Sequence, residues 1–241
     1  TKRVGLVQDL DFLPRQITGV TAYWDADSGV TQASSLASAW VDVVGAFSLA
    51  QATGANKPTV VQNQFNRRTA LRFDGAASFM TTATALSAVI AAATAYLYVV
   101  YRPITVTRSA AAVYDNDGII TDTNGVFGMT AKSAVGLLDY NNDGAWQNNT
   151  LALTLGKPLI VTMKHAGGNI NVRKGNAAYS ANVASGNTSS LTGGLRLGAG
   201  YDNAHFGNFD VGAIVFMNAA PSASDDYRIL RWAGQEFGVT L

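Results

Sequence analysis

The fold is decided by the stretch Val211-Gly-Ala-Ile-Val-Phe-Met-Asn218, a continuous apolar run that predicts a buried strand. Soon after it, Pro221 and Ser222 mark the start of a helix, and the sequence from Asp225 to Phe237 predicts one short helix. Almost everything before this segment predicts β-structure. The chain is therefore expected to end with a buried strand and a helix that covers a sheet.

The closing helix has signals at both ends. Ser222 is the expected N-cap, and Asp225 and Asp226 place negative charge at the positive end of the helix dipole. Gly238 is the expected C-terminal stop. An apolar stripe on one face, flanked by Tyr227 and Trp232, is expected to pack on the sheet, and it consists of Leu230, Ala233 and Phe237.

Short apolar or alternating runs between turns of Gly, Asn and Asp predict most of the other strands. The candidates are 70–73, 95–101, 110–114, 125–129, 135–140, 158–165, 169–173, 194–197 and 211–217. Two hairpins are predicted, one joining Met163 to Val172 and one joining Val113 to Met129. Such tight connections favour an antiparallel sandwich over a parallel sheet.

Composition fits one large β domain. The chain has 241 residues, no cysteine, 14% charged residues and a formal net charge of +1. Nucleic acid is therefore not an expected partner, and thiol chemistry is excluded. No apolar run is long enough to predict membrane insertion. Residues 1–19, interrupted by Asp9, Asp11 and Pro14, are expected to form an extended N-terminal arm, followed by a single sandwich domain over 20–241.

A set of short motifs gives a more specific indication of the fold. These are Trp24-Asp25, Trp40-Val-Asp42, Pro58, Arg72-Phe-Asp-Gly75 and the strand and helix from Gly212 to Gly238. Their order and spacing resemble the laminin-G-like, concanavalin A-like family in the form found in bacteriophage virion proteins. The resemblance implies an all-β, antiparallel, concanavalin A-like jelly-roll β-sandwich with one short C-terminal helix, and it places Trp24 and Trp40 in the core.

The same resemblance implies a function. The chain is expected to be a non-enzymatic phage virion surface protein, a capsid decoration or a tail or fibre component, with a lectin-like role in binding carbohydrate or the host surface. A purely structural virion protein and a polysaccharide-degrading enzyme are the alternatives. Because no secretory signal is visible, the protein is expected to be made in the host cytoplasm and released by lysis onto the virion. The expected partners are other virion proteins, a second copy of the chain through the N-terminal arm, and bacterial surface glycan.

Catalytic residues are scarce in this sequence. Glycoside hydrolysis needs two carboxyl groups, and the single glutamate, Glu236, falls in the closing helix while most aspartates lie in turns. The two histidines, His165 and His205, have no partner at metal-ligand spacing, and no Gly-x-Ser-x-Gly motif occurs. The sequence therefore predicts no enzyme.

Two loops combine aromatic rings with amide and carboxylate groups, the mixture that binds sugars. Such residues are equally common in ordinary β-turns, so a structural role for both loops is the alternative. The candidate glycan-binding residues are Asp143, Trp146, Gln147, Asn148, Tyr201, Asp202, Asn203 and His205.

The first of these loops also overlaps a candidate calcium site. Asp139, Asn141 and Asp143 lie at alternate positions before Gly144, which is how an oxygen-rich calcium loop begins. Thr150 stands where such a loop would supply a bidentate glutamate, which weakens the prediction. The alternative is a simple hairpin turn, and no cofactor is required.

Overall fold

The structure is a computed structural model, and it describes residues 12–45, 47–90, 94–106, 117–124, 127–132, 137–142, 145–147, 151–166, 168–184, 191–200, 202 and 204–241. For residues 132, 137–142, 145–147 and 183 the backbone alone is described.

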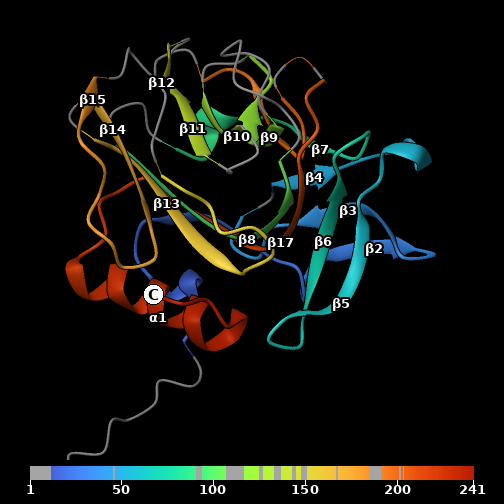
Figure 1. Ribbon diagram of the computed structural model, residues 1–241, viewed down its shortest axis with the longest axis horizontal. Helices are drawn as coiled ribbons and strands as arrows, with labels where there is room; N and C mark the ends of the chain where they lie inside the picture. Colours follow the sequence, from blue (N-terminus) through green and yellow to red (C-terminus); the bar gives the residue numbers. More distant parts are fainter. Residues whose placement is uncertain are drawn as a thin grey trace, which may run out of the picture.

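Most of the regular secondary structure in the described chain consists of antiparallel strands (Figure 1). The strands are β1 (Val20–Asp25), β2 (Val30–Ala33), β3 (Leu36–Val41), β4 (Ser48–Ala50), β5 (Thr59–Phe65), β6 (Arg68–Asp74), β7 (Met80–Ala85), β8 (Thr94–Thr105), β9 (Asp117–Asp122), β10 (Phe127–Lys132), β11 (Leu137–Asn142), β12 (Ala145–Gln147), β13 (Leu159–Ala166), β14 (Asn169–Lys174), β15 (Val183–Ala184), β16 (Gly194–Leu197) and β17 (Asn208–Met217). The helices are the 3-10 turns η1 (Pro14–Gln16), η2 (Gly54–Asn56) and η3 (Leu86–Ala88), and the α-helix α1 (Ala223–Phe237).

Strand β17 is the centre of the first layer. One edge of β17 pairs with β8 over nearly its whole length, and the other edge pairs first with β6 and then with β1. Beyond β8 the layer continues through β13, β14 and β15, and beyond β6 it continues to β5. All of these pairings are antiparallel.

The second layer begins where the sheet curls over. Strand β3 touches β5 through Leu36 and Thr59, and the chain of pairings then runs from β2 and β3 through β4, β7, β16, β9, β10 and β11 to β12. The two layers enclose the main core, which includes Trp24, Trp40, Phe73 and Phe216. The predicted all-β antiparallel sandwich with one short C-terminal helix is confirmed.

Helix α1 covers the outer face of the first layer. Ser222 caps its start by accepting the N–H of Asp225 at 3.1 Å, and Gly238 ends it in the left-handed conformation at φ 67°. A second apolar cluster under the helix contains Leu230, Trp232 and Phe237 packed against residues of β8 and β17. Both predicted helix ends are confirmed, and the predicted stripe is buried.

The two tryptophans of the resemblance are core residues, as expected, and each also makes a cross-strand hydrogen bond. Trp24 Nε1 donates to the carbonyl of Trp40, and Trp40 Nε1 donates to the carbonyl of Asp25, both at 3.0 Å. Both rings are fully buried. Asp42 binds the N–H groups of Val44, Gly45 and Phe47 and so holds the loop after β3. This part of the pattern is therefore structural.

Each residue of Arg72-Phe-Asp-Gly75 also has a structural contact. Arg72 binds Asp210 on β17, and Phe73 stacks on Phe209 with ring centroids 5.0 Å apart. Asp74 accepts the N–H groups of three following residues and thereby closes the turn before β7. Gly75 has φ 73°, which favours glycine.

Most strand predictions agree with the structure, apart from their ends. The hairpin from Met163 to Val172 is confirmed with that pairing. The second predicted hairpin is not found as predicted, because Met129 of β10 pairs with Ile120 of β9 and Val113 lies outside the described residues. Asp117 and Gly118, expected in a turn, instead lie in β9. Residues 110–114 lie outside the described residues. The strands that were not predicted are β1 to β5, β7, β9, β12 and β15. Several of them are rich in Thr, Ala, Gln and Ser, without a clear apolar alternation.

Part of the expected N-terminal arm packs on the domain. Residues 1–11 lie outside the described part of the chain. Phe12 and Ile17 are buried in the cluster under α1, and Pro14–Gln16 form a 3-10 turn rather than extended chain. The boundary at residue 19 stays a prediction.

We expect Gly198→Ala to disrupt the core. A Cβ at this position would lie 2.1 Å from Cδ1 of Phe73. The φ angle of residue 198 is 92°, which is strained for any L-residue. Overpacking and backbone strain together should lower the free energy of unfolding by about 3 kcal/mol, as measured by urea denaturation. Gly168→Ala is the matched control, because its φ is 72° but nothing lies within 4 Å of the new Cβ, so about 1 kcal/mol is expected. Equal losses would contradict the overpacking.

Asp74 should make stability depend on pH. Burial alone would raise its pKa, but hydrogen bonds from Ala77, Ala76 and Ser78 lower the pKa to about 2. Its contribution is therefore complete above the unfolded pKa near ~3.9 and is lost as the pH falls through about 2. Because the side chain is partly exposed, we expect a loss of about 1 kcal/mol in the free energy of unfolding between pH 5 and pH 2. Asp74→Asn, which still accepts these N–H groups, should lack that part of the pH dependence.

Candidate functional site

The sequence predicted the glycan-binding residues on two loops, and the structure describes only some of these residues. Trp146 and Gln147 lie in β12, whose backbone pairs with β11, while Asp143 and Asn148 lie outside the described residues. In the second loop, between β16 and β17, Tyr201 and Asn203 also lie outside the described residues. Asp202 and His205 are described, so the candidate site is built from this loop.

The two described residues of the predicted calcium site lie in a strand and not in a loop. Asp139 and Asn141 are both in β11, and the hairpin closes after Asn142, which pairs with Ala145. Asp143 lies outside the described residues. Within the described part of the chain, no group of three or more His, Asp or Glu side chains is arranged to hold a metal ion. Calcium binding stays a prediction.

Asp202 and His205 form a polar pair at the surface of the β16–β17 loop. The ring Nδ1 of His205 lies 3.2 Å from Oδ2 of Asp202, and Oδ1 of Asp202 accepts the N–H of Ala204 at 3.0 Å. His205 has φ 61°, and its carbonyl accepts the N–H of Gly118 on β9 at 2.8 Å. The backbone thus presents both side chains from a loop fastened to the sandwich.

Arg196 supports this loop from the core side. It is only 6% exposed, and its Nη1 donates to the carbonyl of Gly200 at 2.8 Å. Burial lowers the pKa of Arg196, and the negative charges of Asp202 and Asp122 oppose that shift. The guanidinium therefore links the loop to β9, where Asp122 is completely buried.

A pair of aromatic rings includes the residue that follows His205 in the sequence. Phe206 follows His205, and its ring centroid is 6.2 Å from that of Phe79, at an interplanar angle of 36°. Both rings are half-buried, so each keeps some accessible surface. The loop thus carries an aromatic ring as well as carboxylate and imidazole groups, a mixture that suits a sugar ring and its hydroxyls.

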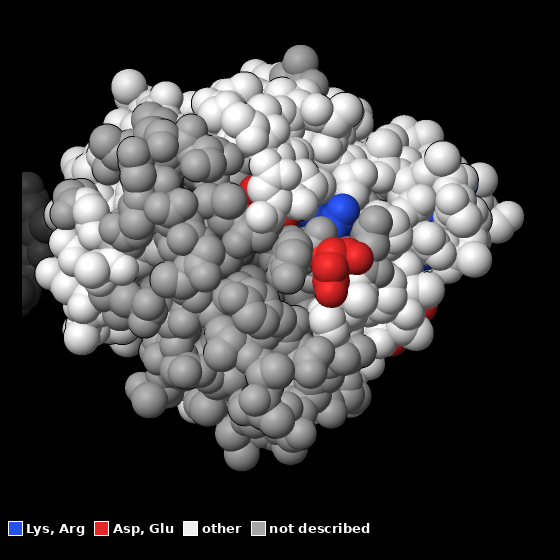
Figure 2. All heavy atoms as spheres, turned by 90° about the horizontal axis from the view of Figure 1, so that it is seen from above, with Lys and Arg blue, Asp and Glu red and all other residues white. Residues whose placement is uncertain are grey.

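The turn between β9 and β10 lies at the other end of β9 from the loop that carries Asp202 and His205, and side-chain hydrogen bonds hold it. Asn124 donates to Thr192 Oγ1 at 2.9 Å, and Asp122 accepts the N–H groups of Phe127 and Asn124. Figure 2 looks onto the molecule from above the view of Figure 1, and a few acidic and basic atoms lie together there among described atoms that are mostly uncharged, beside atoms that are not described. Among the described atoms the patch is small.

Phe79 and Arg196 were missed from the sequence. Phe79 is adjacent to β7, far along the chain from the β16–β17 loop, and only the fold brings it to Phe206. Arg196 looks like an ordinary strand residue. The sequence signal that could have indicated a role for Arg196 is Gly198, two residues later. In the structure this glycine has φ 92°, and the chain turns there.

Many of the acidic side chains already serve structural contacts. Arg68 binds Asp25, Asp27 and Glu236, and thereby joins β1, β6 and α1. Asp226 accepts from Tyr98 and from Arg173, which lies against the ring of Tyr179. His165 is buried in β13, and burial lowers its pKa. These groups stabilise the fold and lie away from the Asp202 and His205 pair in sequence.

No protein-family model and no curated protein matches this chain. Solved structures do share its fold. The chain matches the Trypanosoma rangeli sialidase in complex with 2,3-difluorosialic acid with a TM-score of 0.64 and 14% identity, covering 92% of this chain and 34% of that chain. It therefore spans about a third of the sialidase.

A second match covers a whole domain. Domain 4 of AbnA, a GH43 extracellular arabinanase from Geobacillus stearothermophilus, in complex with arabinotriose, matches with a TM-score of 0.61 and 10% identity over 88% of this chain and 98% of that chain. An arabinofuranosidase complexed with arabinofuranosyl-α-1,2-xylobiose matches with a TM-score of 0.53 and 13% identity, over 81% of this chain and 50% of that chain. At sequence identities of 10 to 14%, these matches show that the fold is shared, and they show nothing about function.

The prediction of a phage virion surface protein, whether decoration, tail or host-attachment component, is wrong. The matching structures just described belong to carbohydrate-active enzymes and not to virion proteins. The physical reason is that the motifs behind the prediction, such as Arg72-Phe-Asp-Gly75, form turns and core contacts of the sandwich. These motifs are features of the fold, and they do not indicate which kind of organism or particle the protein comes from.

No helix in the described chain could span a membrane.

We expect Arg196→Gln to destabilise the protein, because Asp122 would keep its buried charge without the neighbouring cation. The free energy of unfolding should fall by about 3 kcal/mol in urea denaturation. Arg231→Gln, on α1, serves as the control and should change it by less than about 0.5 kcal/mol. If both variants were equally stable, Arg196 would have no supporting role.

Proposed function

We propose that this chain is a non-catalytic carbohydrate-binding domain of the laminin-G-like, concanavalin A-like type. The observation that carries the proposal is the match to Domain 4 of the arabinanase, since it extends over nearly all of that domain and that structure holds arabinotriose. The match supports the fold of a sugar-binding domain, and the local chemistry of the β16–β17 loop supports the site.

The proposed site consists of Asp202, His205, Phe206 and Phe79. Sugars bind where hydroxyl-bonding groups lie beside an accessible aromatic surface, and this loop supplies both within the five positions from Asp202 to Phe206. The contact between His205 and Asp202 and the bond of Asp202 to Ala204 hold the polar groups in place before a ligand arrives. Preorganisation of this kind reduces the entropic cost of binding.

The distribution of carboxylates supports binding without turnover. Glycoside hydrolysis needs a proton donor and a second carboxylate with fixed separation. Glu236 is paired with Arg68, Asp210 with Arg72 and Arg102, and Asp226 with Arg173. Asp202 is the exposed carboxylate of the proposed site, and the nearby Asp122 is completely buried.

The test is titration calorimetry of the purified protein with neutral oligosaccharides, beginning with arabinotriose. Asp202→Asn retains the acceptor for Ala204 but loses the charge, and Phe206→Leu retains apolar bulk but loses the flat ring. We expect each change to weaken binding at least about 10-fold, as for a lost hydrogen bond to a charged group or a lost aromatic contact.

Tyr227→Ala is the matched control, because Tyr227 is an exposed aromatic residue on α1, 53% accessible. It should leave binding unchanged. Equal binding by all variants would overturn the site, and the absence of binding to any neutral oligosaccharide would overturn the function. Release of shorter sugars during incubation would overturn the non-catalytic assignment.

A further inference from the structure

A row of charged side chains crosses the outer face of the first layer, next to α1. Asp210 on β17 lies directly opposite Arg72 on β6 and opposite Arg102 on β8. Gln64 of β5 extends the row, because its Oε1 accepts from both guanidiniums. Four neighbouring strands thus contribute to one polar row.

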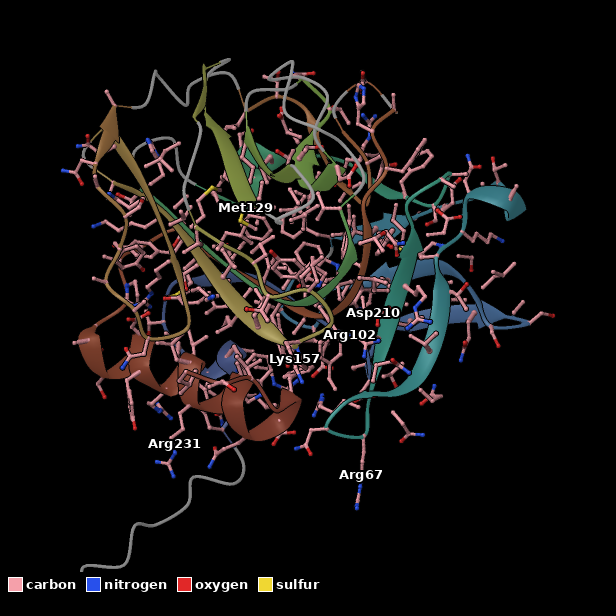
Figure 3. The ribbon with its side chains drawn as sticks, viewed as in Figure 1. Arg67, Arg102, Met129, Lys157, Asp210 and Arg231 are labelled. Atoms are coloured by element: carbon pink, nitrogen blue, oxygen red, sulfur yellow. The ribbon has the colours of Figure 1, made fainter. Side chains whose placement is uncertain are left out.

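The helix ends just before this row. Phe237, the last residue of α1, packs against Gly212, where a Cβ would lie 2.6 Å from its ring. Asp210 stands two residues earlier on β17, and its neighbours Phe209 and Val211 point into the main core. The row therefore lies on the same face as the helix, immediately beyond its end. In Figure 3, Arg102 and Asp210 lie together, whereas Arg67 and Arg231 point away from the molecule.

The central carboxylate holds both arginines in fixed positions. Arg72 donates Nε to Oδ1 of Asp210 at 2.8 Å and Nη2 to Oδ2 at 3.0 Å, and Arg102 Nη2 also donates to Oδ2. The side chain of Asp210 is completely buried, while those of Arg72 and Arg102 are 38% and 21% exposed. The bond to Asp210 raises the pKa of Arg72, so this guanidinium stays charged.

Two guanidiniums share one carboxylate, so the row has a net positive charge. The Nη1 groups of Arg72 and Arg102 have no hydrogen-bond partner among the described residues, and Nε of Arg102 is buried without one. A cluster serving stability alone would be expected to satisfy its buried donors. The nearby carboxylate of Asp74 is occupied by the N–H groups of its own turn.

We propose that Arg72 and Arg102 form a binding site for the carboxylate group of an acidic saccharide, of the uronic acid class. A rigid pair of planar guanidiniums matches the two oxygens of a carboxylate, and one spare positive charge matches its single negative charge. This site uses none of the residues of the proposed neutral-sugar site, so either can fail without the other.

The surroundings of the row favour a sugar over an acidic protein segment. Gln64, Asn208 and Thr105 are polar, and Asn208 Nδ2 donates to Thr105 Oγ1 at 2.8 Å on the same face. The described large hydrophobic residues that are exposed, such as Leu155 and Tyr227, are not part of the row. Protein interfaces depend on buried apolar or aromatic anchors, whereas hydroxyl groups suit a polar face.

The experiment compares trigalacturonate with its methyl ester by titration calorimetry at low ionic strength. The two probes have the same sugar skeleton and differ in charge. We expect the native protein to bind the acid at least about 10-fold more tightly than the ester, and Arg102→Gln to remove that preference while Arg72 still pairs with Asp210. Arg231→Gln removes a cation outside the row and should leave the preference intact.

A second variant covers the case in which Arg102→Gln folds poorly. This triple variant, called the neutral row, combines Arg72→Gln, Arg102→Gln and Asp210→Asn, so no buried charge is left without a partner. It should bind acid and ester equally. Equal affinity of the native protein for both probes, an unchanged preference in the neutral row, or equally tight binding of polyglutamate would overturn the proposal. Loss of neutral-sugar binding in Asp202→Asn concerns the other site and leaves this result unaffected.

Discussion

The structure depends on the burial of β17 on both of its faces. Alternate residues of this strand face the core between the layers, with Phe209, Val211 and Phe216, or the cluster under α1, with Val215 and Met217. A strand buried in this way needs partners on both edges to satisfy its backbone, and β8 on one side with β6 and β1 on the other supply them. Helix α1 covers the second face. Its packing against Gly212 also fixes where the polar part of that face begins.

The parts of the fold that could be predicted from sequence are those with a local cause. The closing strand has an uninterrupted apolar run, and the helix has a serine cap and a left-handed glycine, so both were found with nearly correct ends. Strand β2 could not be found in this way, because its residues Val30–Ala33 are mostly exposed and their pairing with β3 is decided by the rest of the sandwich. Asp117 and Gly118 look like a turn, yet β9 buries them beside Ala199.

The candidate site shows the same division. Asp202 and His205 were recognisable because they lie three residues apart in a polar loop. Phe79 and Arg196 were not, because their roles depend on tertiary contacts. The motifs that looked most specific proved to be the most structural: Asp42 and Asp74 hold turns, and Trp24 and Trp40 hold strands together.

The position of β17 in the chain also affects how the protein is made. Its partners β1, β6 and β8 all precede it, and the contact between Thr21 and Phe216 joins residues 195 positions apart. During synthesis these strands leave the ribosome long before the strand that pairs with them, so the first layer cannot close until β17 has been made. Folding dominated by such distant pairings is slow and leaves apolar strand edges exposed in the meantime. The nascent chain should therefore depend on chaperones until residues 208–217 emerge.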